Sequence, residues 1–318
     1  MMARSGSSGE RERGMAPQIL RAYLWIALFL TFPVGLLRDA AGTGALLCGY
    51  AAFLALTAAA IFAVGAEKTG QGGTVREGAT FLPGLLLAVG PLVLLLGASV
   101  TGEPTASLPG DYVLNTTAIL LGSVILIGGF LTLAERLWEA GQRLLPMLGL
   151  AGLLVGAAVW LANLVFRYAI VASGAAGLQA RVEARAWVAH EYLRGLEGPP
   201  SWMELLLVWT DMLQITFVLL SYLSAAAFGV AMVRAGWLGR LGSGLFISLN
   251  VALTVMVLAG IILADVSVVA AWTAYILTIP FMVFIMPYFV GVALMRPLRR
   301  KSAARGQRDP VIESVLLR

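Results

Sequence analysis

Charged residues are scarce in this chain. Only 12% of its 318 residues are Asp, Glu, Lys or Arg, whereas about a quarter of the residues of a soluble domain are charged. Hydrophobic residues make up 59% of the chain and its mean hydropathy is +0.88. Too few charged groups remain to cover a water-facing surface, so this composition excludes a soluble globular fold and predicts a membrane protein.

The residue types that carry most protein chemistry are nearly absent. His190 is the only histidine, Cys48 is the only cysteine, and Lys68 and Lys301 are the only lysines. One histidine excludes a bis-histidine haem and a two-histidine metal site within the chain, and one cysteine excludes a disulfide framework. Both lysines lie at a predicted cytoplasmic boundary, which excludes a retinal Schiff base inside a bundle. We therefore expect no cofactor, and we interpret Cys48 as a small packing residue.

Long apolar runs dominate what is present. A helix needs about 20 apolar residues to cross a membrane core of roughly 30 Å. Eight runs approach or exceed this length: 18–37, 44–65, 80–100, 113–134, 146–170, 203–233, 242–264 and 267–295. The sequence therefore predicts an all-α, polytopic bundle of about eight transmembrane helices. The first run is too long for a signal-peptide core and is interpreted as a retained anchor.

The basic residues alternate between the two sides of these spans. One set of flanks contains most of them: Arg11, Arg13, Arg21, Lys68, Arg76, Arg136, Arg143, Arg234, Arg240, Arg296, Arg299, Arg300, Lys301, Arg305 and Arg308. By the positive-inside rule both termini are cytoplasmic, which agrees with an even number of spans. The net charge of +5 follows from this bias, so no nucleic-acid partner is expected and the partners are membrane lipids.

The chain divides into a membrane domain and its flanks. Residues 18–295 form the transmembrane domain, residues 1–17 are a polar, disordered cytoplasmic tail, and residues 296–318 are a basic cytoplasmic tail. Within the domain, 172–201 is the one sizeable connection, and its apolar residues recur at helical spacing. It is predicted to be an external amphipathic helix that ends at Gly198-Pro199-Pro200.

Asp211, in the stretch "LLLVWTDMLQITFVLL", is the polar residue that most needs an explanation. A carboxylate at the centre of a span costs a few kcal/mol and marks a candidate functional position. By depth, Arg167 and Asn163 of the fifth span are expected to approach Asp211 in the sixth. Further polar residues are expected to join them in the outer half of helices five to eight, and the full predicted cluster is Asn163, Arg167, Asp211, Gln214, Asn250, Thr254 and Tyr275.

Two interpretations of this cluster remain open. In one, Asp211 and Arg167 form a buried ion pair and the amides link helices, because lipid cannot satisfy such groups. In the other, the cluster lines a pocket in which Arg167 holds an anionic group and Asp211 a cation or a proton. A second acidic group, Glu135 and Glu139 in "AERLWEAGQR", is interpreted as a helix end stabilised by a Glu139–Arg143 pair, with a cation or phosphate site as the alternative.

Glycines and prolines predict how the helices pack and bend. Gly152 and Gly156 are spaced for close helix contact in the fifth span, as are Gly90 and Gly97 in the third and Gly122 and Gly129 in the fourth. Pro280 and Pro287 predict a kink in the last span. The hairpin "RLWEAGQRLLPMLGLAGLL" loosely echoes "VRAGWLGRLGSGLFISLNV", and such a relation would make the two hairpins parallel.

The C-terminal half carries a resemblance of low specificity. The stretches "VWLANLVFRYAIVAS", "SYLSAAAFGVAMVRAGWLGRLGSG" and "PYFVGVALMR" resemble patterns in uncharacterised bacterial multi-pass inner-membrane protein families. The resemblance implies a bacterial inner-membrane location and transfers no site residue.

Three classes of function follow. The first is a non-catalytic membrane protein, either an accessory subunit of other membrane proteins or a module that binds a small molecule or a lipid. The second is a transporter of a small molecule or an ion that uses the polar cluster. The third, an intramembrane enzyme, is disfavoured, because no nucleophile, base and orienting group can be assembled at one depth.

Overall fold

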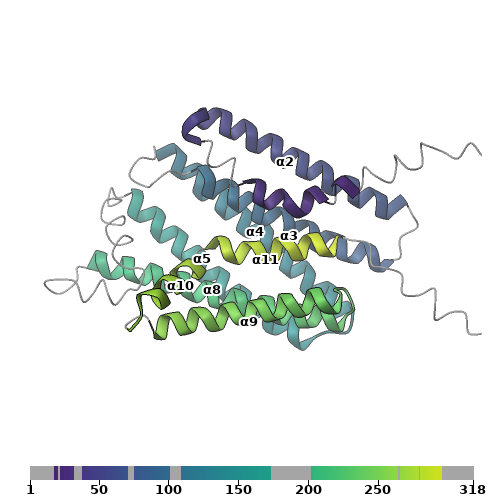
Figure 1. Cartoon of the computed structure of the whole chain (residues 1–318). Helices are drawn as coiled ribbons and strands as arrows, with labels where there is room; N and C mark the ends of the chain where they lie inside the picture. The colour runs from purple at the N-terminus through teal and green to yellow at the C-terminus, as the bar shows by residue number, and fades with distance from the viewer. Residues whose placement is uncertain are drawn as a thin grey trace, which may run out of the picture.

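The described part of the protein is helical throughout. The computed structural model describes residues 18–20, 22–31, 38–70, 75–100, 109–172, 202–263, 266–278 and 280–295, and within these ranges it contains no strand (Figure 1). The all-α prediction is therefore confirmed. The predicted tail 1–17, the connection from residue 173 to 201 and the basic tail 296–318 lie outside the described residues.

The helices follow the predicted apolar runs closely. A short helix at residues 22–31 precedes α2 (Arg38–Gly70), α3 (Val75–Val100), α4 (Pro109–Glu139), α5 (Leu144–Ala172), α8 (Trp202–Arg234), α9 (Arg240–Ile262), α10 (Val268–Thr278) and α11 (Pro280–Leu294). Most helices extend a few residues past the apolar run, because polar and charged residues at the ends continue the helix beyond the apolar core.

The last predicted span, 267–295, is two helices. α10 ends at Thr278 and α11 begins at Pro280. Residue 279, between them, lies outside the described residues. Pro280 is the first residue of α11, a position at which the missing N–H of proline is tolerated. Pro287, by contrast, lies inside α11. The predicted kink at Pro287 stays a prediction.

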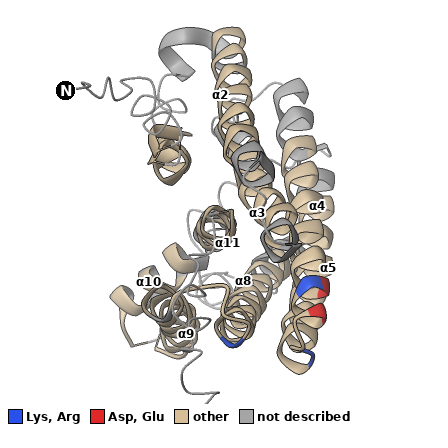
Figure 2. Ribbon diagram, turned by 90° about the vertical axis from the view of Figure 1, so that its right-hand side faces the viewer, with Lys and Arg blue, Asp and Glu red and all other residues tan. Residues whose placement is uncertain are grey.

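The last helix occupies the centre of the bundle. Viewed along the bundle, α11 lies between α3 on one side and α8 on the other, with α9 and α10 below it and α2 above (Figure 2). The extensive contacts join α3 to α4, α5 to α8 and α11 to α3, and α8 also packs against α9. The C-terminal helix therefore connects the N-terminal half of the bundle to its C-terminal half.

Within the described residues, four helical segments are long and apolar enough to cross a membrane: Thr117–Glu139, Leu144–Phe166, Met212–Arg234 and Leu241–Ile262. Shorter apolar helices occur at Gln18–Thr31, Cys48–Val64, Thr80–Leu95 and Phe284–Leu294. Large apolar side chains also face outward, and on α9 Leu241, Leu245, Val255 and Ile262 are each more than half exposed. A surface of this kind requires lipid, so the chain is a helical membrane protein.

The helices of the N-terminal half touch at glycines. A methyl group added to Gly122 of α4 would come within 2.6 Å of Leu94 Cγ and 2.8 Å of the Gly90 carbonyl oxygen of α3. Gly84 of α3 and Gly291 of α11 meet in the same way, with the Gly291 carbonyl oxygen 2.8 Å from a methyl placed on Gly84. Only a residue without a side chain allows backbones to approach this closely, as the sequence predicted for Gly90 and Gly122.

The turns of the α4–α5 and α8–α9 hairpins have the same hydrogen-bonding pattern. Gly141 and Gly236 both have positive φ, of 83° and 71°. Gln142 N donates to Leu137 O at 2.9 Å, and Trp237 N donates to Met232 O at 3.0 Å. This is the Schellman arrangement, which needs a glycine at the left-handed position. Both turns lie at the same end of the bundle (Figure 1), so the parallel relation suggested by the two sequences holds for these hairpins.

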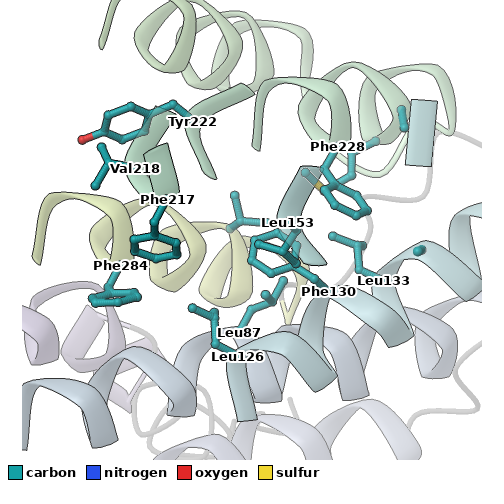
Figure 3. Packing of buried hydrophobic residues seen from close by; sticks show 14 of the residues in the cluster. Leu87, Leu126, Phe130, Leu133, Leu153, Phe217, Val218, Tyr222, Phe228 and Phe284 are labelled. Carbon is teal, nitrogen blue, oxygen red and sulfur yellow. The ribbon is translucent and has the colours of Figure 1, made fainter. Parts of the chain in front are cut away.

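The main core is aromatic at its centre. Phe217 of α8 and Phe284 of α11 face each other with ring centroids 6.3 Å apart, and Phe130 of α4 lies 5.2 Å from Phe228 of α8 (Figure 3). A second cluster, which includes Leu28, Ile61, Ala88 and Tyr288, joins the 22–31 helix to α2, α3 and α11.

We expect Gly122→Ala to lower the stability of the bundle, because the new methyl would collide with the backbone of α3. Overpacking of this kind costs about 1–3 kcal/mol, seen as a fall of several degrees in the melting temperature of the detergent-solubilised protein. Gly128→Ala is the matched control, since a methyl at this position of the same helix meets nothing within 4 Å. Equal melting temperatures for the two variants would contradict the proposed glycine contact.

Candidate functional site

A ridge of glycines sets the contact between α5 and α8. Gly152 lies against Ser224, whose Oγ would be 2.7 Å from an added methyl, and Gly156 lies against Leu220 and Phe217. The two helices are antiparallel, so moving outward along α5 means moving toward the start of α8. The ridge, which includes the predicted pair Gly152 and Gly156, therefore fixes which residues of the two helices lie at the same depth.

Two aromatic contacts confirm this register. Trp160 of α5 stacks on Phe217 of α8 with centroids 4.9 Å apart, and Phe166 meets Trp209 edge-on at 5.3 Å. Asn163 lies between Trp160 and Phe166 on α5. Its depth therefore corresponds to the stretch between Phe217 and Trp209 on α8, which contains Thr210, Asp211 and Gln214.

The seam between these aromatic pairs is polar and buried. Asn163 is fully buried, Thr210 is 2% exposed, and Gln214 is half-buried. All three residues take part in interactions with the rest of the protein. We call Asn163, Thr210 and Gln214 the α5–α8 polar seam. Thr210 was not among the predicted residues, although its spacing of four from Gln214 on one helix face could have identified it.

The side chains of three predicted residues lie outside the part that the structure describes. These are Arg167 on α5, Asp211 on α8 and Tyr275 on α10. Their backbone positions are described, and the register places Arg167 within about 3 Å, or roughly half a helical turn, of the depth of Asp211. Whether the two side chains pair stays a prediction.

Asn250 and Thr254 lie at another depth. At about 1.5 Å per residue, Asn250 is roughly 20 Å from the turn at Gly236, whereas Asn163 is roughly 33 Å from the turn at Gly141. Packing agrees with this count, because Gly229 of α8 contacts Phe246 of α9 and so places Asn250 near Ala225, far from Gln214. The residues of the single predicted cluster therefore lie at two depths. Asn163 and Gln214 lie far from the turns, whereas Asn250 and Thr254 lie closer to them.

The described seam offers hydrogen bonding. Its amides and hydroxyl can donate and accept hydrogen bonds without changing charge. Among the described residues, no group of three His, Cys, Asp or Glu side chains could hold a metal ion. The arrangement therefore offers hydrogen bonds between two aromatic pairs, and none of its three side chains carries a charge.

The described charged side chains gather at the opposite end, on the two turns (Figure 2). Glu135, Arg136, Glu139 and Arg143 flank the α4–α5 turn, and Arg234 ends α8. Arg136 Nη1 donates to Glu139 Oε2 at 2.8 Å. The predicted partner of Glu139 was Arg143. α4 ends at Glu139 and the positive-φ Gly141 follows, so Glu139 and Arg143 are not spaced along one helix.

A double-mutant cycle tests the predicted Asp211–Arg167 pair. Asp211→Asn should lower the melting temperature by leaving the arginine without its counter-ion, and adding Arg167→Gln should recover much of that loss. The measurement is thermal unfolding of all four proteins in one detergent. Additive losses from the two changes would exclude a direct pair.

The chain was compared with family models, with curated proteins and with solved structures, and none of them matches. The resemblance of the C-terminal half to bacterial multi-pass families therefore stays a prediction. Function has to be inferred from the seam, the helix contacts and the charged turns of the chain itself.

Proposed function

We propose that the protein is a non-catalytic membrane module whose α5–α8 polar seam binds a small polar molecule or the headgroup of a lipid. The observation that carries this proposal is the burial of Asn163 and Thr210, with half-buried Gln214 beside them, within about one helical turn of depth. Polar side chains are costly in a membrane interior, and this chain uses few of them. Placing three together on facing helices favours recognition of a polar group.

The surroundings of the seam support binding. The Trp160–Phe217 pair bounds the seam on the side of the α4–α5 and α8–α9 turns. The Phe166–Trp209 pair bounds it on the other side, toward the C-terminal end of α5 and the N-terminal end of α8. Ligand sites commonly combine apolar and aromatic walls with a few placed polar groups. Asp211 and Arg167 lie on the same two helices at neighbouring depths, so the charge of a ligand could be matched by either side chain.

The proposal includes a location and a topology. The protein would cross the bacterial inner membrane eight times, with the shorter apolar helices joining the four long ones as spans. The described side chains at the α4–α5 and α8–α9 turns include three arginines and two glutamates. The arginines favour a cytoplasmic position for both turns by the positive-inside rule. Both termini would then be cytoplasmic.

A transporter is the second candidate. The observation that favours it is the break between α10 and α11, since discontinuous helices near the membrane centre often form transport sites. In this case the seam would be the substrate site, about two helical turns along α8 from the break, and purified protein in liposomes would accumulate a substrate. The binding module and the transporter therefore share the seam and differ in whether the bound molecule crosses.

Native mass spectrometry of the protein in mild detergent tests the binding proposal. Wild type should carry a bound small molecule or lipid, and the double variant Asn163→Leu, Thr210→Val should lose it. Ser221→Ala is the control on the same helix, because its hydroxyl donates only to its own helix, to Phe217 O at 2.7 Å. Copurification of another protein without a bound molecule would favour the accessory-subunit alternative, and retention of the molecule by the double variant would refute the seam as the site.

Cysteine labelling tests the topology. In a Cys48→Ser background, Ala140→Cys and Gly239→Cys place thiols on the two exposed turns. Both should react with an impermeant maleimide in inside-out vesicles and stay unreacted in intact cells. Ser107→Cys lies between the predicted spans 80–100 and 113–134, a connection that is external in the proposed topology, and should show the opposite pattern. Labelling of the two turns from opposite sides would overturn the proposed arrangement.

A further inference from the structure

The carbonyl end of α10 lies inside the bundle. The last four carbonyls of a helix have no partner within that helix, and Pro280 supplies no N–H. Tyr222 of α8 donates its hydroxyl to Leu277 O at 2.9 Å. This bond satisfies one carbonyl at the end of α10 and shows that the break lies directly beside the middle of α8.

Two separate contacts bring the polar face of α9 to the same depth. Gly229 of α8 packs on Phe246 and Ile247, which places Thr254 opposite Tyr222 in the antiparallel hairpin. Gly260 of α9 packs on Ala270 and Ala274, which places Thr254 opposite the last turn of α10. The contact with α8 and the contact with α10 thus agree, and Thr254 lies level with the broken end.

Asn250 follows one turn away on the same buried face of α9. Its side chain is 0% exposed, and its Nδ2 donates to Phe246 O at 2.8 Å. Its Oδ1 is buried with no hydrogen-bond partner. Thr254 Oγ1 donates to Asn250 O at 2.9 Å and keeps its own lone pairs available. A buried amide oxygen without a partner is costly, so a bound group that it could accept or coordinate would stabilise the fold.

We propose that Asn250 and Thr254, together with the carbonyl end of α10, form a binding site for a monovalent alkali cation. An amide oxygen, a hydroxyl oxygen and backbone carbonyls are the oxygen ligands that hard cations take. The negative end of the α10 dipole points at the same place. The described ligands are all neutral, which favours a monovalent ion over Ca²⁺ or Mg²⁺, because divalent ions usually require carboxylates. The site is distinct from the α5–α8 polar seam and does not depend on the proposed function.

Thermal unfolding in three salts tests the proposal. The purified full chain is melted in NaCl, KCl and choline chloride at equal ionic strength. Wild type should show a saturable rise in melting temperature with Na⁺ or K⁺ relative to choline. Asn250→Leu should abolish the rise, and Asn250→Asp should lower the half-saturating cation concentration by about tenfold through the added negative charge.

Ser224→Ala is the matched control. Ser224 lies on α8 near the depth of Asn250, but it faces Gly152 of α5 on the other side of the helix. Its cation response should equal that of wild type. Identical melting temperatures of the wild type in all three salts would overturn the proposal. Asn250 Oδ1 would then accept a hydrogen bond from a water molecule in place of binding a cation. A retained response in Asn250→Leu would overturn it as well.

A second pair of variants decides the matter if Asn250→Leu fails to fold. Thr254→Val removes one proposed ligand and keeps the shape of the side chain. It should raise the half-saturating concentration about tenfold, while Asn250→Asp lowers it by a similar factor. Unchanged half-saturation in both variants would refute the site.

Discussion

Close approach of helices at glycines is the constraint on which this structure depends. Lipid competes with side chains for apolar contact, so membrane helices associate through dense packing and hydrogen bonds more than through the hydrophobic effect. Gly90 with Gly122, Gly84 with Gly291 and the α5 ridge at Gly152 provide this packing. A side chain at these points would separate the backbones and shift every contact further along the same pair of helices.

The register that the glycines impose lets a few hydroxyl groups satisfy helix ends inside the bundle. Tyr222 donates to Leu277 O beside the break, Tyr50 donates to Thr31 O at the end of the first helix, and Thr80 donates to Leu294 O at the end of α11. Each acceptor belongs to the last turn of a helix, where carbonyls have no partner of their own. These three hydroxyl groups thus pair backbone carbonyls that would otherwise be unsatisfied in an apolar medium.

The same register separates the polar groups of the C-terminal half into two levels. The α5–α8 polar seam lies far from the turns between aromatic pairs, while Asn250 and Thr254 lie closer to the turns, beside the broken helix. α8 contributes to both levels, because Gln214 and Tyr222 lie on one helix about two turns apart.

The sequence by itself determined the class of the protein and the places where helices form. Scarce charge required a membrane, apolar runs set the helices to within a few residues, and Gly122 and Gly152 were recognisable as contact points. Tertiary structure decided the depth of Asn250, the ion pair of Glu139 with Arg136 and the break before Pro280. Periodicity locates a residue around and along its own helix. The depth at which it meets a neighbour depends on the turn between them and on the glycine at which they touch.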